Sequence, residues 1–157
     1  LKKPPPPPRW CARPPGELAA PMEKLRQLGL AYVRFAREHP EQYRLATMQP
    51  AVTERVDQVL ASAAFTHFAE TVQDCIAAGI FRSGDAVTIA LELWAAAHGI
   101  ASLQITKPWL PWGDLDDVAD RVLRAACVGH AVCDRIEGDV TPDAVLEWLS
   151  AHDRQGA

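Results

Sequence analysis

The sequence predicts an all-α bundle of about five to six helices. Apolar residues recur every three or four positions along most of the 157 residues, a spacing that places them on one face of a helix. Proline, glycine and aspartate interrupt this pattern at positions typical of helix ends. Valine and isoleucine never alternate with polar residues between hairpin turns, so no sheet is expected. A chain of this length suits one domain with a substantial core.

The expected helices are separated by prolines, glycines and aspartate caps. Gly79 is expected to cap the end of one helix, and Asp85 and Asp114 to cap the starts of two others. Pro21 fits a first helical position, where its missing N–H costs nothing. In chain order, the expected helices are residues 21–39, 41–48, 51–78, 85–106, 114–135 and 141–151.

Residues 1–20 differ in composition from the rest, and we interpret them as a proline-rich linker or remnant ahead of one helical domain at residues 21–157. The proline run at residues 4–8 favours an extended polyproline II conformation and cannot continue a helix. Such a tract can also bind an aromatic groove of another protein, although this one lacks a flanking pattern. The chain begins with Leu1 rather than methionine, which is consistent with a segment missing upstream.

The charge of the chain argues against direct binding to nucleic acid. The formal net charge is −4 and only residues 1–13 are locally basic, whereas a duplex-binding surface needs clustered lysine and arginine. The longest apolar stretch, residues 86–103, contains polar residues that favour a buried helix over a membrane span. No secretory signal is visible, and no membrane association is expected.

The cysteines indicate a cytoplasmic protein. They form no Cys-x-x-Cys pair, and their spacing does not suggest a disulfide framework. Reduced, buried thiols are the simpler interpretation. The four residues are Cys11, Cys75, Cys127 and Cys133.

The helix expected at residues 85–106 is apolar almost all round and therefore needs cover on several sides. The following helix carries small residues that permit close approach of another helix. Small residues also occur in ordinary antiparallel packing, so that explanation stays open. We favour a homodimer with a closed, self-complementary four-helix interface. The residues expected in this interface are Gly99, Leu103, Val118, Val122, Ala125, Ala126 and Gly129.

Aromatic and polar residues on the inward sides of three helical units suggest a ligand site for a small hydrophobic effector. Such sites are mostly apolar and contain a few polar groups that orient the ligand. Trp94 and His98 lie one turn apart on one face, and His67 is also expected to face inward. A filled core with satisfied tyrosines and a buried histidine explains the same composition. The residues expected to line the site are Tyr32, Phe35, Tyr43, Phe65, Phe68, Leu91, Trp94 and His98.

Two segments of the chain resemble the C-terminal domain of TetR-family transcription regulators. Residues 94–103, Trp-Ala-Ala-Ala-His-Gly-Ile-Ala-Ser-Leu, resemble the Trp-His-Gly signature of one type of this domain. Residues 28–36, followed by His39-Pro40 and Tyr43, resemble its first sensor helix. The segments have the expected order and separation, and with the helix pattern the resemblance covers residues 21–135.

The resemblance implies an effector-binding and dimerisation domain with a TetR-like helical bundle. Members of the family sense small, usually hydrophobic molecules and couple occupancy to the separation of two helix-turn-helix heads. No helix-turn-helix segment precedes Pro21, so DNA binding is expected only through a domain that is absent from this chain. The expected function is small-molecule sensing and homodimerisation in a repressor. Residues 139–157 lie outside the resemblance.

Other kinds of chemistry find less support in the sequence. Cys127, His130 and Cys133 are three apart on one helix, so the outer pair diverges by about 120° and a tetrahedral zinc site would need a further ligand. His98 could act with Glu92 in catalysis or hold a haem, but no accompanying motif supports either role. We expect no catalytic residue, metal or cofactor. A ligand-free helical dimerisation module ranks second to a sensor domain, and a small helical enzyme third.

Overall fold

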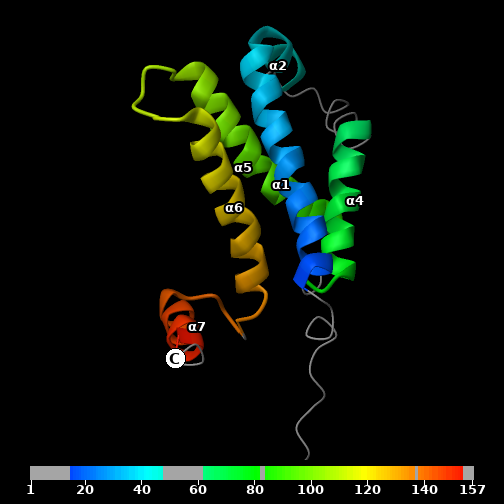
Figure 1. The fold of residues 1–157 in the computed structure, drawn as a ribbon, viewed down its shortest axis with the longest axis vertical. Coiled ribbons are helices and arrows are strands. Elements are labelled where there is room, and N and C mark those ends of the chain that lie inside the picture. Colours follow the sequence, from blue (N-terminus) through cyan, green and yellow to red (C-terminus); the bar gives the residue numbers. More distant parts are fainter. Residues whose placement is uncertain (1–14, 48–61, 82–83, 137, 154–157) are drawn as a thin grey trace, which may run out of the picture.

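The computed structural model describes residues 15–47, 62–81, 84–136 and 138–153, with side chains from residue 20 onward. Within these residues the chain forms six helices and no strand (Figure 1), which confirms the predicted all-α fold. The helices are α1 (Pro15–Glu38), α2 (Pro40–Thr47), α4 (Ala63–Ala77), α5 (Ala86–Thr106), α6 (Leu115–Cys133) and α7 (Pro142–Asp153).

Aspartate caps and one glycine define helix ends where the sequence predicts them. The carboxylates of Asp85 and Asp114 accept hydrogen bonds from backbone N–H groups in the first turns of α5 and α6. Asp116 and Asp117 add negative charge near the positive end of the α6 dipole. Gly79 follows α4 with a φ of 76°, a left-handed conformation that glycine adopts without steric cost.

Helix α1 begins earlier than the sequence indicates. The expected start is Pro21, but the helix begins at Pro15 and Pro21 lies inside it. Proline suits a first helical position, and this property applies to Pro15 as well as to Pro21. Inside the helix Pro21 removes one backbone hydrogen bond, which a helix of 24 residues tolerates near its start. Residues 15–20, assigned to the linker from the sequence, therefore belong to α1, while residues 1–14 lie outside the described part.

The expectation of a single long helix at residues 51–78 is wrong in where this helix starts. Helix α4 begins at Ala63, because the backbone of Ser62 is extended and its hydroxyl accepts a hydrogen bond from the N–H of Phe65. A serine that satisfies a backbone donor in this way starts a new helix instead of continuing an old one. Residues 48–61 lie outside the described residues. The remaining helix ends agree with expectation to within about two residues.

Helix α5 is central to the bundle and packs against α1, α4 and α6 (Figure 1). Two clusters of core residues meet on its buried side, and burial of this apolar surface is the main favourable contribution to folding. The cluster toward the N-terminal end of α5 consists of Leu25, Phe65, Val72, Cys75, Phe81, Ile89, Ala90, Leu93 and Cys127. The cluster toward its C-terminal end consists of Leu30, Val33, Ala36, Tyr43, Ala97, Ile100, Ala101, Ala119 and Leu123.

The opposite side of α5 is apolar but uncovered by the described residues. Val87, Leu91 and Leu103 are each between 38% and 46% exposed. By length and composition alone, α5 could cross a membrane, and it is the one described helix that meets this test. The core helix of a soluble protein meets it as well, and packing against three neighbours is the environment of such a helix.

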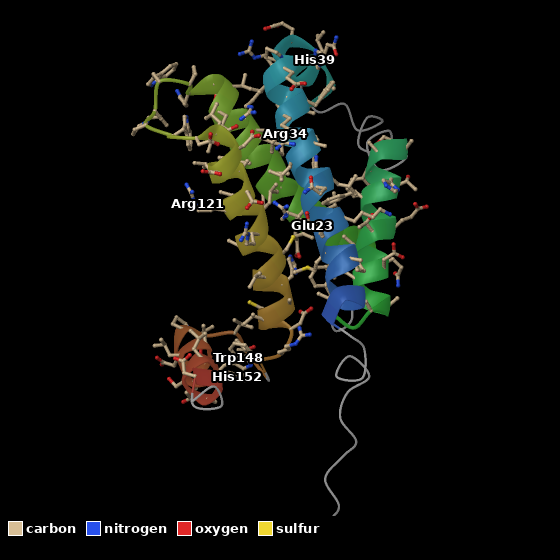
Figure 2. All side chains as sticks on the ribbon, in the orientation of Figure 1. Glu23, Arg34, His39, Arg121, Trp148 and His152 are labelled. Atoms are coloured by element: carbon tan, nitrogen blue, oxygen red, sulfur yellow. The ribbon has the colours of Figure 1, made fainter. Side chains whose placement is uncertain are left out.

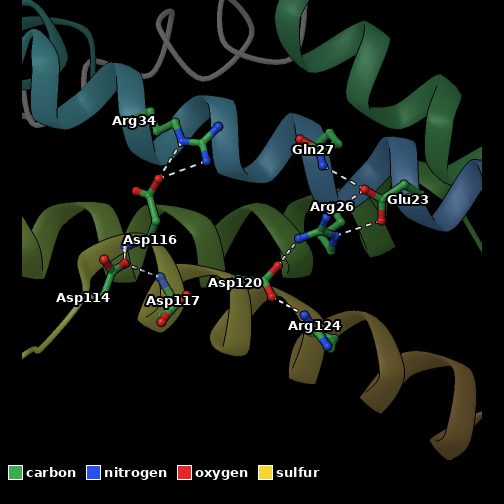
Figure 3. A network of polar contacts seen from close by, with 9 residues as sticks. All are labelled: Glu23, Arg26, Gln27, Arg34, Asp114, Asp116, Asp117, Asp120 and Arg124. Atoms are coloured by element: carbon green, nitrogen blue, oxygen red, sulfur yellow. Dashed lines mark hydrogen bonds and ion pairs between the residues drawn. The ribbon is translucent and has the colours of Figure 1, made fainter.

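Ion pairs hold α1 beside α6 (Figure 3). The carboxylate of Asp116 on α6 lies 2.9 Å from the guanidinium of Arg34 and 2.6 Å from that of Arg37, both on α1. One turn later on α6, Asp120 pairs with Arg26 of α1. Burial opposes ionisation of Asp116, but hydrogen bonds from the two arginines outweigh it and lower its pKa. The hydrogen bond from Arg26 likewise lowers the pKa of Asp120.

Helix α7 stands apart from the bundle, beyond the C-terminal end of α6 (Figure 1). None of its residues is buried, and Leu146 and Leu149 are exposed. Trp148 stacks on His152 one turn later, with ring centroids 3.9 Å apart (Figure 2). A helix of 12 residues gains little stability on its own in water, so this local stacking is a substantial part of its support.

Gly29 marks a close approach of α1 to α6. A Cβ at this position would lie 3.0 Å from both Cδ atoms of Leu123, which is tighter than ordinary van der Waals contact. Glycine in a helix interior costs about 1 kcal/mol relative to alanine. The contact with Leu123 explains why the middle of α1 carries this residue.

We predict that Gly29→Ala leaves the free energy of unfolding nearly unchanged, because contact with Leu123 offsets a propensity gain of about 1 kcal/mol. In a Leu123→Val background, which lacks the Cδ atoms, the same substitution should stabilise the protein by about 1 kcal/mol. Urea denaturation of the complete double-mutant cycle measures both effects. A full gain in the wild-type background would contradict the packing argument.

Candidate functional site

Four side chains from three helices form a hydrogen-bonded group that we name the aromatic cluster: Tyr32 of α1, Tyr43 of α2, and Trp94 and His98 of α5. The Nδ1 atom of His98 lies 2.8 Å from the hydroxyl of Tyr43 and 3.1 Å from that of Tyr32. The Tyr43 hydroxyl also donates to the backbone carbonyl of His98 over 3.3 Å. Two phenols from different helices therefore hold one imidazole.

The rings of the aromatic cluster pack at angles typical of aromatic contacts. Tyr32 meets Tyr43 and Trp94 edge to face, with ring centroids 5.7 Å and 6.4 Å apart. The ring of His98 lies 5.2 Å from that of Trp94 and stacks on Tyr43 at 5.6 Å. Tyr43 is buried, whereas the other three side chains are half-buried. The cluster thus has a covered base and accessible edges.

Helix register and one proline bring these side chains together. Trp94 and His98 are four residues apart, so they share a face of α5. Pro40 disfavours helical backbone at the residue before it, and α1 ends at Glu38 while α2 begins at Pro40. The resulting change of direction brings Tyr43 of α2 to His98, a contact between residues 55 apart in sequence.

Burial keeps the aromatic cluster uncharged at neutral pH. It raises the pKa of Tyr32 and of Tyr43, and it lowers the pKa of His98 below the ordinary value of 6.5. Within the described residues, the hydrogen bonds of these side chains involve no carboxylate, guanidinium or ammonium group. The cluster can therefore offer hydrogen bonds and aromatic surface, but no counter-charge.

Three other residues expected at the ligand site lie outside the aromatic cluster. Phe65 belongs to the core cluster toward the N-terminal end of α5, and Phe68 packs against that cluster. Leu91 is 38% exposed on the uncovered side of α5. A ligand-binding role for these three residues remains a prediction.

Two side chains expected to face inward are instead exposed. Phe35 is 43% exposed, with its ring centroid 5.1 Å from that of His39. It follows Tyr32 by three residues and is rotated from it by about 60°, which carries it from the inner face of α1 to the outer one. His67 on α4 is exposed as well, and its Nδ1 lies 3.7 Å from the carboxylate of Glu70. The expectation that both side chains face inward is therefore wrong. A short apolar pattern does not determine which residues lie at the edge of the buried face of a helix.

The residues expected at a dimer interface lie along α5 and α6 with unequal exposure. Leu103 and Ala125 are exposed. Val118 and Val122 are partly buried against the core cluster toward the C-terminal end of α5, and Ala126 against the other. Their participation in an interface remains a prediction.

Two glycines in helix interiors contact no neighbouring side chain among the residues that the structure describes. A Cβ at Gly99 of α5 or at Gly129 of α6 would meet no atom within 4 Å. Between these helices, the Nε2 atom of His130 lies 3.2 Å from the carboxylate of Glu92. Sequence reasoning missed this pair, because residues on separate helices can be matched only when the relative rotation of the helices is known.

The cysteines differ in exposure. Cys75 and Cys127 are buried, and burial raises their pKa values to about 12 and about 11. Cys133 is exposed, which corrects the expectation of a buried thiol, and Cys11 lies outside the described residues. No group of three or more potential metal ligands occurs in the described part of the chain.

Lowering the pH below 6.5 should destabilise the wild type through His98. The pKa of His98 is lower in the folded state than in the unfolded state. As the pH falls through these values, the unfolded chain binds more protons than the folded protein, so stability decreases as the pH decreases. His98→Asn keeps an acceptor near the Nδ1 position but does not titrate. Its unfolding free energy should fall less between about pH 7.5 and about pH 5.5 in urea denaturation. Equal losses in the two proteins would argue against His98 as the titrating group.

Comparison with known families relates this geometry to a protein class. The family described as "Tetracyclin repressor-like, C-terminal domain" matches residues 25–127, a span that contains the whole aromatic cluster. No match is found among curated proteins or among solved structures. The family match covers more than half of the 157 residues and agrees with the all-α fold. The chain therefore belongs to the tetracycline repressor-like (TetR) family, as a C-terminal domain.

Proposed function

We propose that this chain is the small-molecule-sensing and dimerisation domain of a cytoplasmic TetR-type repressor, of the Trp-His-Gly type. Ligand occupancy controls DNA binding by a helix-turn-helix domain of the same regulator. The family match supports a regulatory role rather than an enzymatic one, because C-terminal domains of TetR regulators are associated with ligand binding and dimerisation. The aromatic cluster is the observation that carries the proposal.

The aromatic cluster suits a binding site for a small hydrophobic molecule. Its rings come from three helices, and the imidazole of His98 is positioned by two phenols at 2.8 Å and 3.1 Å. Ligand sites typically combine apolar walls with a few oriented polar groups, and this arrangement has both. In a filled core, Trp94 and His98 would be fully buried, whereas both are half-buried.

The uncovered side of α5 and the adjacent side of α6 suit a homodimer. Val87, Leu91 and Leu103 form exposed apolar surface on a helix with a single acidic residue and no lysine or arginine. Gly99 and Gly129 permit another helix to approach closely, and neither contacts a neighbouring side chain among the described residues. Pairing two copies through α5 and α6 gives a closed four-helix interface.

Helix α1 provides the physical link between the two activities. Tyr32 attaches one side of α1 to the aromatic cluster, while Arg34 and Arg37 attach another to Asp116 of α6. A ligand that prefers one position of Tyr32 would shift the population of α1 positions relative to α6. Because α6 belongs to the proposed dimer interface, such a shift alters the relation between subunits.

The sensing role predicts that hydrophobic compounds which raise the melting temperature of the wild type do so through the aromatic cluster. Ligand bound to the native state stabilises it by mass action. Trp94→Ala and His98→Ala should reduce these shifts, whereas Trp109→Ala, at a 71% exposed position in the α5–α6 loop, should not. A thermal-shift screen of the four proteins provides the comparison. Equal shifts in His98→Ala and wild type would place the ligand elsewhere.

The dimer proposal predicts opposite effects of one substitution on folding and on association. Alanine at Gly99 or Gly129 should stabilise an isolated subunit by about 1 kcal/mol, because it improves helix propensity without a clash. In a dimer with close helix contact, the same methyl group should weaken association. Sedimentation equilibrium measures the dimer constant, with Thr66→Ala, at an exposed position on α4, as a control for association. A wild type that is monomeric at micromolar concentration would contradict the proposal.

A further inference from the structure

The hydrogen bonds of the aromatic cluster leave one ring nitrogen of His98 available. Two tyrosine protons have two acceptors within reach, the Nδ1 atom and the backbone carbonyl of His98. Tyr43 lies within range of both acceptors, and Tyr32 of Nδ1 alone. Donation from Tyr43 to Nδ1 accounts for the shortest of these contacts, 2.8 Å, and the Tyr32 hydroxyl lies within hydrogen-bond range of the same nitrogen. We assign Nδ1 as the acceptor in these contacts, so that the neutral ring carries its proton on Nε2.

The Nε2–H group of His98 has no protein partner among the described residues. The imidazole is half-buried, so this donor lies at the accessible edge of the cluster instead of deep in the core. A donor in a mostly apolar setting favours a ligand that brings its own acceptor, because burying the donor unpaired would cost free energy. A carbonyl oxygen is the simplest such acceptor.

Three arginines of α1 are engaged in ion pairs on another side of the helix. Arg26 pairs with Asp120 and Arg34 with Asp116 (Figure 3). Arg37 pairs with Asp116 as well. These ion pairs direct the guanidinium groups toward α6, while Tyr32 turns toward α2 and α5. Among the residues that the structure describes, a carboxylate ligand in the aromatic cluster would therefore find no cation hydrogen-bonded to the cluster, and an ammonium or amidinium ligand would find no carboxylate there.

The rings favour a flat partner. Tyr32, Tyr43 and Trp94 present aromatic faces and edges around one imidazole, with centroid distances between 5.2 Å and 6.4 Å for the contacts that join them. Conjugated molecules pack on such surfaces with little loss of internal freedom. Hydrogen bonding, charge and shape thus lead to the same class of ligand.

We infer that the effector is an uncharged, conjugated molecule whose carbonyl-type acceptor receives a hydrogen bond from Nε2 of His98. This inference rests on the proposed sensing function and specifies its ligand class. Ligand charge is the discriminating property, since an unpaired charge must be desolvated without compensation in this site.

Three probes that share a ring system and differ in charge test the inference. They are 2-naphthamide, 2-naphthoate and 2-naphthamidinium, titrated against the full chain at neutral pH by ligand-observed NMR. The amide should bind at least about tenfold more tightly than either charged probe, a difference of about 1.4 kcal/mol. His67→Gln, at an exposed histidine on α4, serves as the control and should bind as the wild type does.

Two substitutions at His98 separate its nitrogens. Asparagine retains an acceptor near Nδ1 for the tyrosines but lacks an atom at Nε2, so His98→Asn should lose about tenfold or more in amide affinity. Glutamine places an amide N–H near the Nε2 position, so His98→Gln should retain more of the affinity than His98→Asn. ¹⁵N chemical shifts of the imidazole report the tautomer independently, and they should show the proton on Nε2.

The outcomes distinguish this inference from the proposed function. Equal or tighter binding of naphthoate or naphthamidinium, sensitive to His98→Asn, would overturn the uncharged ligand class and leave the sensing site intact. Equal affinity of the amide for wild type and His98→Asn would show that Nε2 donates no hydrogen bond to it, against the inference. Equal affinity for Trp94→Ala as well would show that it binds away from the aromatic cluster, against the site itself. Failure of all three probes to bind, or a proton on Nδ1, would overturn the inference while the broader compound screen continues to test the sensing function.

Discussion

Helix α5 carries one acidic residue, Glu92, and no lysine or arginine over 21 positions. The rest of the domain is arranged so that neighbouring helices bury its apolar surface. No single neighbour can bury a helix that is apolar almost all round. Helices α1, α4 and α6 therefore pack on one side of it, and their core residues meet there in two clusters. The cost of leaving α5 exposed explains why helices distant in sequence converge on it.

The candidate functional features lie where the packing of α1, α4 and α6 against α5 ends. Trp94 and His98 are half-buried, next to the exposed arc that contains Leu91. On one border of that arc, the phenols of Tyr32 and Tyr43 form hydrogen bonds with His98. On the other border, His130 of α6 lies next to the carboxylate of Glu92. Buried polar groups need partners, and a border between core and solvent allows those partners to be shared with a ligand or a second subunit.

Much of the fold could be predicted because its signals are local. Asp85, Asp114 and Gly79 define helix ends through contacts within a few residues, and the structure agrees with each. Proline is ambiguous between starting a helix and lying near its start, so the beginning of α1 at Pro15 instead of Pro21 could not be foreseen. The helical spacing of apolar residues continues on both sides of Ser62 in the sequence, so its role as a helix cap could not be recognised from that spacing.

The site was less predictable, because it depends on how helices rotate about their axes. The spacing of Trp94 and His98 fixes their common face, but nothing local distinguishes Tyr32, which reaches His98, from Phe35, which is exposed. A rotation of about 60° separates the two side chains on α1. That rotation is set by long-range contacts: Gly29 against Leu123, and the arginines of α1 against Asp116 and Asp120.

These same contacts give α1 its two-sided character. Its arginines are committed to α6 through partly buried ion pairs, which hold better than fully exposed ones because solvent screens them less. Its tyrosine reaches a cluster without charge, where the hydrogen bonds of Tyr32 and Tyr43 to one imidazole can be exchanged for bonds to a ligand at small net cost. The ion pairs fix the register of α1 on α6, whereas the hydrogen bonds of Tyr32 can change when a ligand binds. A helix attached in this way can carry a change at His98 to the surface of α6 without unfolding any part of the core.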